Sequence, residues 1–345
     1  MIADFVARAP KTGVLLVNTG SPERPDAAAV RSYLARYLSD PRIVPTNPLL
    51  WKLILHCCIL TTRPKQSAEK YRLIWTNEGS PLIVGHEKLA AALADDLAQE
   101  GFACEVRSAM SYSHPLVKTA LESMREAGCN RLVVVPTYPQ SAFSTTMAVH
   151  DDLEKQLRLI EWAPDLQFVE SYSSNPAYSE AIAASIEDAG FEAERGDRVL
   201  LSFHSIPIKD VEAGDTYGEQ ARVTGTDVAR LLGIEPGRCA VSFHSRFDKQ
   251  RSWVSPFTHD VLETWACEPD AQRVFVACPG FAVDCLESLY DINMQLKPYY
   301  EACRREAGGT IDGDSFVYVP CLGYSQRHVA VLRAVVMPFL TKGDS

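Results

Sequence analysis

Two segments far apart in the chain place polar side chains directly after apolar runs of strand length. VLLSFHSIP, residues 199–207, carries His204 at the end of its apolar run. VFVACPGFAVDCLESL, residues 274–289, carries Asp284 and Glu287 after its own run. In an open parallel sheet, ligands bind in the crevice at the carboxyl ends of the strands. An imidazole that faces carboxylates across such a crevice can move protons or bind a metal ion.

Three acidic residues follow the second run at a helical spacing. Asp284, Glu287 and Asp291 stand at i, i+3 and i+7, which predicts that they share one face of a helix. Neighbouring carboxylates repel one another, so this face needs either water or a cation. A solvated surface face is the simpler explanation. Because the helix directly follows a strand and a Pro-Gly turn, we expect its first turn at the crevice, which favours a cation-handling role.

Two histidines are candidates for the polar residue at a strand end. Pro207 cannot donate a hydrogen bond to a sheet, so the strand stops near it and His204 lies at the strand's mouth. SFHSRF, residues 242–247, places His244 at the end of another apolar run in the same manner. Each could also be a buried structural histidine, and the sequence does not choose between the two strand ends.

Loop residues suggest a pocket for a flat, apolar ligand. Tyr138 opens the loop YPQSAFSTT, while Trp253 and Phe281 add planar apolar surface near other strand ends. Packing within the core is the alternative for each aromatic ring. The loop after the first strand begins at Asn18 and lacks both the GxGxxG spacing and a GxxxxGK[ST] motif, which argues against nucleotide binding.

Composition excludes some classes of function. The chain has 345 residues, a net charge of −10 and no basic stripe, so nucleic acid is not expected as a partner. Its ten cysteines include no CxxC pair, and residues 1–13 contain no apolar signal core. Both features predict reduced thiols in a cytoplasmic protein. The apolar stretch 49–60 is too short to span a bilayer. It is either a helix of the core or an apolar lip that contacts a membrane or a hydrophobic ligand.

The order of the predicted elements indicates an α/β fold of two Rossmann-like halves, each a parallel sheet flanked by helices, with a cleft between them. GVLLVN near residue 13 and VLLS near residue 199 echo each other, as do RLVVVP and RVFVACP, which favours a duplicated unit. We place the halves at 1–170 and 171–345, with the last helix, 325–340, packing back on the first half. Strands are predicted over 13–18, 103–109, 131–136, 166–170, 197–203, 239–244, 272–277 and 315–319, and helices over 26–38, 66–76, 82–100, 114–127, 144–160, 176–192, 216–232, 256–266, 284–302 and 325–340.

These segments resemble, in order and over nearly the whole chain, those of the ferrochelatases, which insert ferrous iron into a porphyrin to make haem. The resemblance implies that His204 and Glu287 are the essential pair, that Asp291 lies on an ion path, and that Asp284 assists it. The matching stretches are 13–22, 30–34, 38–42, 63–64 with Tyr71, 78–82, 138–146, 202–207, 245–247 with Trp253, Pro256 and Thr258, and 278–289.

The resemblance also implies the surroundings of the substrate. Tyr138, Trp253 and Phe281 match positions near the macrocycle, and Asn18 and Cys285 are assigned to the same pocket. Gln295 stands where some members have a further carboxylate, so the acidic path is shorter. Phe143 replaces one cysteine of the [2Fe–2S] cluster that some members carry, and no cysteine triplet follows the last helix, so no cluster is expected.

The expected activity is therefore ferrochelation with Fe²⁺ as substrate and protoporphyrin IX as the favoured porphyrin, because the loop 18–22 resembles that type. The alternatives are a coproporphyrin III ferrochelatase, a chelatase for another tetrapyrrole or metal, and a porphyrin or haem carrier without turnover. By the same resemblance, 48–60 would form a lip for peripheral membrane contact, and the protein is expected to be a monomer or a homodimer.

Overall fold

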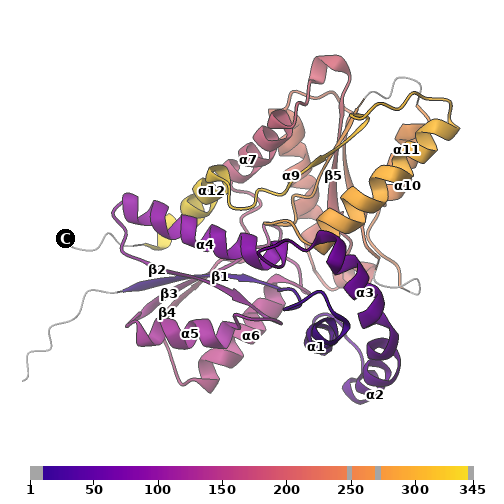
Figure 1. Ribbon diagram of the computed structural model, residues 1–345. Helices are drawn as coiled ribbons and strands as arrows, with labels where there is room; N and C mark the ends of the chain where they lie inside the picture. Colours follow the sequence, from indigo (N-terminus) through magenta and orange to yellow (C-terminus); the bar gives the residue numbers. More distant parts are fainter. Residues whose placement is uncertain (1–10, 247–250, 269–272, 341–345) are drawn as a thin grey trace, which may run out of the picture.

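The computed structural model describes residues 11–246, 251–268 and 273–340, which form two parallel four-stranded sheets (Figure 1). The predictions for residues 1–10 and 341–345, for Phe247 and for the first residue of the strand expected over 272–277 lie outside these ranges. The α/β class with two Rossmann-like halves is confirmed. The strands are β1 Thr12–Asn18, β2 Glu105–Met110, β3 Arg131–Pro136, β4 Asp165–Phe168, β5 Arg198–His204, β6 Cys239–His244, β7 Val274–Ala277 and β8 Phe316–Val319.

The two sheets have equivalent strand orders, β2-β1-β3-β4 and β6-β5-β7-β8. The sequence echoes therefore fall on equivalent strands, β1 with β5 and β3 with β7. Helices cover both faces of each sheet (Figure 1). The α-helices are α1 Ala27–Tyr37, α2 Pro48–Ile54, α3 Leu60–Ile74, α4 Pro81–Gln99, α5 Val117–Glu126, α6 Thr146–Leu159, α7 Pro176–Asp188, α8 Ile208–Glu212, α9 Tyr217–Leu231, α10 Thr258–Ala266, α11 Lys297–Glu306 and α12 Gln326–Val336. Two π-helices, η1 Leu55–Ile59 and η3 Glu287–Leu296, and two short 3₁₀ turns, η2 Ala193–Arg195 and η4 Met337–Phe339, complete the elements.

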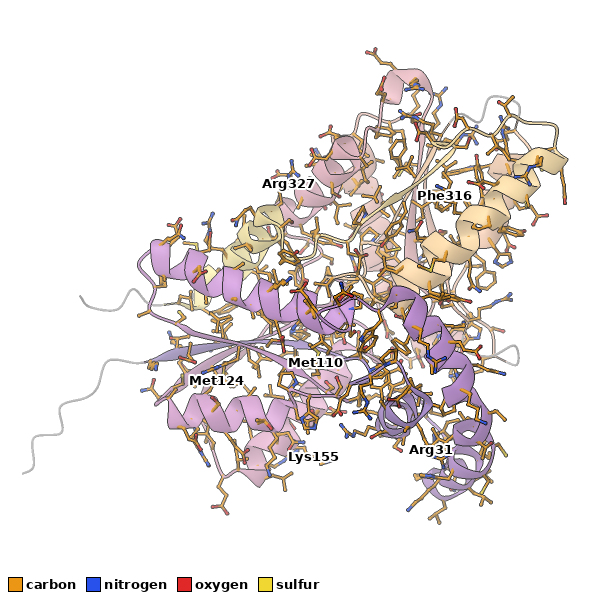
Figure 2. The ribbon with its side chains drawn as sticks, viewed as in Figure 1. Arg31, Met110, Met124, Lys155, Phe316 and Arg327 are labelled. Carbon is orange, nitrogen blue, oxygen red and sulfur yellow. The ribbon has the colours of Figure 1, made fainter. Side chains whose placement is uncertain are left out.

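The central strands are apolar on both faces because both faces are covered. Val14 and Leu16 of β1 belong to the cluster under α4, whereas Leu15 and Val17 belong to the cluster under α5 and α6. Met124 of α5 fills the second of these layers (Figure 2). Continuous burial along β1 explains why the strand reads as an apolar run rather than as an alternating pattern.

The core also joins the two halves. The cluster under α4 includes Val199 and Leu201 of β5 together with apolar residues of α12. At the edge of this contact, Arg333 of α12 donates to Asp96 of α4 at 3.0 Å. The last helix thus contacts the first half as well as α7, which belongs to the second. The chain passes from one sheet to the other between β4 and β5, and the division near residue 170 stays a prediction.

An excursion made of α1, α2, η1 and α3 projects beside the first sheet (Figure 1). Asp26 caps α1 by accepting from the N–H groups of Ala28 and Ala29, and Asn47 caps α2 ahead of Pro48. Arg31 of α1 donates to the Leu60 carbonyl at 2.6 Å and so ties α1 to the start of α3 (Figure 2). No side chain of α2 is buried. The core-helix interpretation of this stretch is therefore wrong for α2, which presents an apolar surface instead.

The helix predicted over 284–302 differs from its prediction. Asp284 precedes the helix, which becomes π-helical from Glu287 to Leu296 and continues as α11 from Lys297. Pro298 lies where the π-helix passes into α11, and its missing N–H interrupts the hydrogen-bond pattern of the continuous helix at this change. Apolar periodicity does not distinguish a π-helix from an α-helix, and π-helical turns occur frequently at functional sites.

Two buried histidines should make the fold sensitive to acid. Burial lowers the pKa of His86 on α4 to about 3 and that of His328 on α12 to about 4. His86 lies between the hydroxyls of Ser108, at 2.6 Å, and Thr137, at 3.0 Å. Both folded-state pKa values lie below the unfolded value of about 6.5. Below that pH the unfolded chain therefore binds protons that the folded chain excludes.

The stability that these histidines provide is present above about pH 6.5 and is lost as the pH falls toward about 4. We expect the free energy of unfolding to drop by about 1.4 kcal/mol per histidine per pH unit in this window. Urea unfolding between about pH 7 and about pH 5 measures the slope. The variant His328→Gln should flatten it, and the exposed His56→Gln should leave it unchanged; equal slopes in all three proteins would contradict the prediction.

Candidate active site

A cavity of about 440 Å³ lies where strands of both sheets end. Its wall includes Asn18 at the end of β1, Tyr138 after β3, His204 at the end of β5 and Ser245 after β6. This is the crevice at the carboxyl ends of parallel strands that the sequence predicted. Residues of α1, α3 and η3 complete the wall, so the excursion covers the strand ends of the sheets.

His204 has a defined tautomer in this wall. Its Nδ1 lies 2.7 Å from the Ser205 carbonyl oxygen, which can only accept, so Nδ1 carries the hydrogen and donates. In the neutral ring, Nε2 then keeps its lone pair for a proton or a metal ion. The side chain is half-buried and lines the cavity.

His244 is the register partner of His204 across β5 and β6, and the two ring centroids lie 5.9 Å apart. It does not line the cavity. Its Nδ1 is 2.8 Å from the Ser202 hydroxyl, its ring stacks on Phe281, and only 6% of the residue is exposed. Burial holds the pKa of His244 well below the usual value, with nearby His204 as a smaller cause. Of the two rivals, only His204 therefore faces the cavity.

Glu287 and Asp291 lie one turn apart on η3 and both line the cavity. The Ser245 hydroxyl donates to Oδ2 of Asp291 at 3.0 Å, and Nζ of Lys70 is 3.9 Å from Oδ1. Ser245 adopts a left-handed φ of 58°, a strained conformation for serine that is typical of functional sites. Burial raises the pKa of Asp291, and the neighbouring Glu287 charge raises it further.

Asp284 is placed differently from its prediction. Its Oδ1 accepts hydrogen bonds from the Tyr318 hydroxyl, the Ser288 hydroxyl and the Cys321 backbone N–H. It does not line the cavity. The assumption of an α-helix starting at residue 284 was wrong, so Asp284 does not share a helix face with Glu287. Its contacts tie the loop between β7 and η3 to the end of β8.

Replacing Asp284 with alanine should therefore lower stability rather than iron affinity. The change leaves the Tyr318 hydroxyl and the Cys321 N–H without their acceptor, which costs about 1–3 kcal/mol of unfolding free energy for each group that stays unsatisfied. Urea unfolding measures this loss, and the exposed Asp95→Ala is the control. A large rise in the KM for Fe²⁺ with stability unchanged would restore the metal-binding interpretation.

The predicted pocket residues divide into those that line the cavity and one that does not. Tyr138, Phe281, Asn18 and Cys285 line it. Trp253 does not; it is 8% exposed and forms an isolated β-bridge with Pro207 outside the cavity. The structure thus places Trp253 in a buried position outside the cavity wall, and its contact with the substrate stays a prediction.

The lining residues differ in what they can offer a ligand. The Asn18 amide is occupied, donating to Thr137 at 2.8 Å and accepting from the Thr19 N–H at 2.7 Å, so it shapes the loop. The Tyr138 hydroxyl is hydrogen-bonded to Thr19. Burial raises the pKa of Cys285 well above its usual value, which keeps the thiol protonated. These residues therefore offer a ligand aromatic and apolar contact, while other lining residues are polar or charged.

Several lining residues were missed from the sequence. Tyr33 and Tyr37 of α1 stack at 5.9 Å, and both reach the cavity. Burial, with a smaller effect of Glu287, raises the pKa of the Tyr71 phenol well above its usual range. Cationic side chains also line the cavity, namely Arg63 and Lys70 of α3 and Arg246 after β6. The sequence shows that Tyr33 and Tyr37 stand at i and i+4 and so share one helix face. It does not show the packing that brings α1 over the strand ends.

The site does not contain a ready-made metal cage. Within residues 11–246, 251–268 and 273–340, no group of three or more His, Cys, Asp or Glu side chains is arranged to hold a metal ion. His204, Glu287 and Asp291 instead share one cavity.

The fold first defines the class. The chain is similar in structure to the sirohydrochlorin chelatase SirB from Bacillus subtilis subspecies spizizenii, solved in complex with cobalt. The alignment covers 95% of this chain and 94% of that chain, with a TM-score of 0.52 and 12% sequence identity. SirB from Bacillus subtilis with Fe³⁺ gives a TM-score of 0.53 at the same coverage and 12% identity. The chain thus has a chelatase-type fold.

The sequence then defines the family. The family model described as Ferrochelatase matches residues 11–339. A ferrochelatase of Nitrosococcus oceani is 38% identical over 333 residues, 96% of this chain and 87% of that protein. A ferrochelatase of Azoarcus sp. is 43% identical over 312 residues, 90% of this chain and 83% of that protein. The chain belongs to the ferrochelatase family, whose enzymes insert ferrous iron into a porphyrin to make haem.

Proposed function

We propose that the porphyrin binds in the 440 Å³ cavity and is metallated there between His204 and Glu287. The observation that carries this proposal is that His204 at the end of β5 and Glu287 on η3, which follows the neighbouring strand β7, line one cavity together with aromatic rings. A porphyrin is flat and apolar, and must bend to turn a nitrogen lone pair toward the metal. Rings such as Tyr138 and Phe281 supply planar walls for that purpose.

Insertion exchanges two pyrrole N–H protons for one Fe²⁺ ion. We assign proton removal to His204, because its Nε2 keeps a lone pair while Nδ1 is held by the Ser205 carbonyl. We assign the iron side to Glu287, because Asp291 places a second carboxylate one turn away on η3. Fe²⁺ accepts carboxylate and imidazole ligands without the tight coordination that would prevent its transfer to the porphyrin.

For the substrate, we favour protoporphyrin IX over coproporphyrin III. Of the three cations that line the cavity, Lys70 lies beside Asp291. The guanidinium groups of Arg63 and Arg246 are then the two cations that suit the propionates, and two propionates match them better than four. Anaerobic Fe²⁺ insertion with each porphyrin, followed by absorbance, tests the choice. A larger kcat/KM with protoporphyrin IX is expected; a larger value with coproporphyrin III would reverse the assignment. Stoichiometric binding of both without turnover would point to a carrier.

We also propose that α2 touches a membrane surface. Leu49, Leu50 and Leu53 are 83%, 57% and 62% exposed, and Asn47 caps the helix that presents them. Contiguous exposed leucines are unusual on a soluble surface and mark interaction sites. No helix within the described residues is long and apolar enough to cross a membrane, so the contact proposed here is peripheral.

Changing these three leucines to serine should weaken binding to phosphatidylcholine–phosphatidylglycerol vesicles by more than about tenfold, because even partial insertion contributes about 1 kcal/mol per leucine. Cosedimentation measures the partition. Leu159→Ser and Val223→Ser, at 64% and 52% exposure on other helices, form the matched control. If the triple leucine variant and the control variant bound the vesicles equally well, the proposed membrane contact of α2 would be refuted.

Three further assignments stand as proposals. All ten cysteines are free thiols, which supports a cytoplasmic location. Their spread over the chain supports the absence of a [2Fe–2S] cluster, and anaerobically purified protein should show no iron–sulfur absorbance. The expectation of a monomer or a homodimer is tested by sedimentation.

A further inference from the structure

A second cavity, of about 230 Å³, lies beside the catalytic cavity. Ser21 and Ser80 line both cavities, so two small hydroxylated side chains stand between them. Ser21 is 3% exposed, and its Oγ lies near the Tyr71 phenol without a hydrogen bond of ordinary geometry in the described part of the chain. The hydrogen-bonding capacity of this buried hydroxyl, in the wall that the two cavities share, is therefore not fully used by the described residues.

The outer wall of this second cavity is acidic. Glu23, Glu78 and Glu87 line it together with His114. Glu78 accepts from Lys88 at 2.8 Å, whereas Glu23 lies 3.8 Å from His114. With Lys88 counted and His114 neutral, the wall carries a net charge of −2, from three carboxylates and one ammonium. The amino end of α4 at Ser80 contributes only about +0.5, so the carboxylates dominate the local field.

The two cavities therefore differ in their charged groups. The catalytic cavity carries the cations Arg63, Lys70 and Arg246, which suit a substrate with carboxylates, beside the acids Glu287 and Asp291, whereas the described lining of the second cavity contains carboxylates and no Lys or Arg. The second cavity repels such a substrate and concentrates cations. The described residues provide no group of three or more potential ligands for a metal ion, so an ion that enters keeps most of its water.

We propose that this second cavity captures hydrated Fe²⁺ and admits it to the catalytic cavity past Ser21 and Ser80. The inference rests on the proposed function of the catalytic cavity. It gives iron an approach separate from the cationic wall that receives the porphyrin. Fe²⁺ can then enter while the porphyrin already occupies the catalytic cavity. Weak, water-mediated capture is the appropriate mode, since the ion is to be passed on.

The test is the double variant Glu23→Gln/Glu87→Gln in the full-length enzyme. We expect the KM for Fe²⁺ to rise by up to about tenfold at low ionic strength, with kcat and the KM for the porphyrin unchanged. The difference should shrink near about 1 M salt, where the Debye length is about 3 Å. Glu180→Gln/Glu187→Gln on α7, which removes two exposed charges away from both cavities, is the matched control and should keep the wild-type KM.

A second variant and a second readout keep the inference separate from the proposed function. Val84→Phe, in the wall of the second cavity only, should slow insertion at limiting Fe²⁺ without changing any charge. Mn²⁺ binding, measured by water-proton relaxation without porphyrin, should weaken in Glu23→Gln/Glu87→Gln whether or not the enzyme turns over. The proposed iron entrance would be refuted if Glu23→Gln/Glu87→Gln changed neither the KM for Fe²⁺ nor the binding of Mn²⁺. It would also be refuted if the control Glu180→Gln/Glu187→Gln showed equal changes. Absent turnover in the wild type with Mn²⁺ binding retained would instead refute the proposed function alone.

Discussion

The variant His204→Ala is expected to insert Fe²⁺ with a kcat lower by about 10²–10⁴-fold, the range that one positioned acid or base contributes. The physical reason is the fixed tautomer, in which Nδ1 donates to Ser205 and leaves Nε2 available toward the cavity. The KM for the porphyrin should change little, because the aromatic walls remain in place. Anaerobic initial rates measured over a range of pH give both constants.

The control for this prediction is His259→Ala on α10, a partly exposed histidine that does not line the cavity. It should retain wild-type activity, and circular dichroism establishes that both variants are folded. A further readout is the dependence of kcat on pH. If the imidazole accepts a proton, one of the slopes of this profile should be absent in His204→Ala. Activity of His204→Ala within about twofold of wild type would contradict the assignment.

The second large effect is expected for Glu287→Gln, which keeps the shape of the side chain and removes its charge. We predict a loss of about 10²-fold in kcat, because a neutral amide no longer attracts Fe²⁺ toward the ring. The Glu287 charge is one cause of the raised pKa of Asp291, so in the variant that pKa should fall and Asp291 should stay ionised at lower pH. Steady-state rates at saturating porphyrin measure the effect.

Glu306→Gln on α11 removes one exposed carboxylate outside the cavity and should have no effect on the rate. The variant Asp291→Asn distinguishes the contribution of Asp291 to iron insertion from that of Glu287. If Asp291→Asn abolished insertion while Glu287→Gln left it near wild type, the iron side would belong to Asp291. The retained activity of Glu287→Gln would then show that the resemblance had assigned the wrong carboxylate.

The fold was largely predictable because its strands are continuous apolar runs between helical patterns. All eight predicted strands overlap observed ones, and the echo between β1 and β5 anticipated the equivalent strand orders of the two sheets. The helix after β7 was predicted less well. Glu287 and Asp291 share its inner face, but Asp284 precedes it, because the chain becomes helical only after the turn that Asp284 anchors.

The site was only partly predictable. His204 and His244 end neighbouring strands in register, and both follow an apolar run. Tertiary contacts separate them, because His244 is buried against Phe281 and bonded to Ser202, whereas His204 lines the cavity. Trp253 has the residue type of a pocket wall, but it is buried and does not line the cavity. The tyrosines and cations of α1 and α3 reach the cavity through tertiary packing alone, which local patterns do not encode.

The central claim is that the macrocycle lies in the 440 Å³ cavity between His204 and Glu287. Its most direct test is a crystal structure of the metal-free enzyme with protoporphyrin IX. The account predicts a bent ring against Tyr138 and Phe281, with the His204 Nε2 near the pyrrole nitrogens on one face and the Glu287 carboxylate on the other. A porphyrin bound elsewhere, or one with both side chains on the same face, would contradict it.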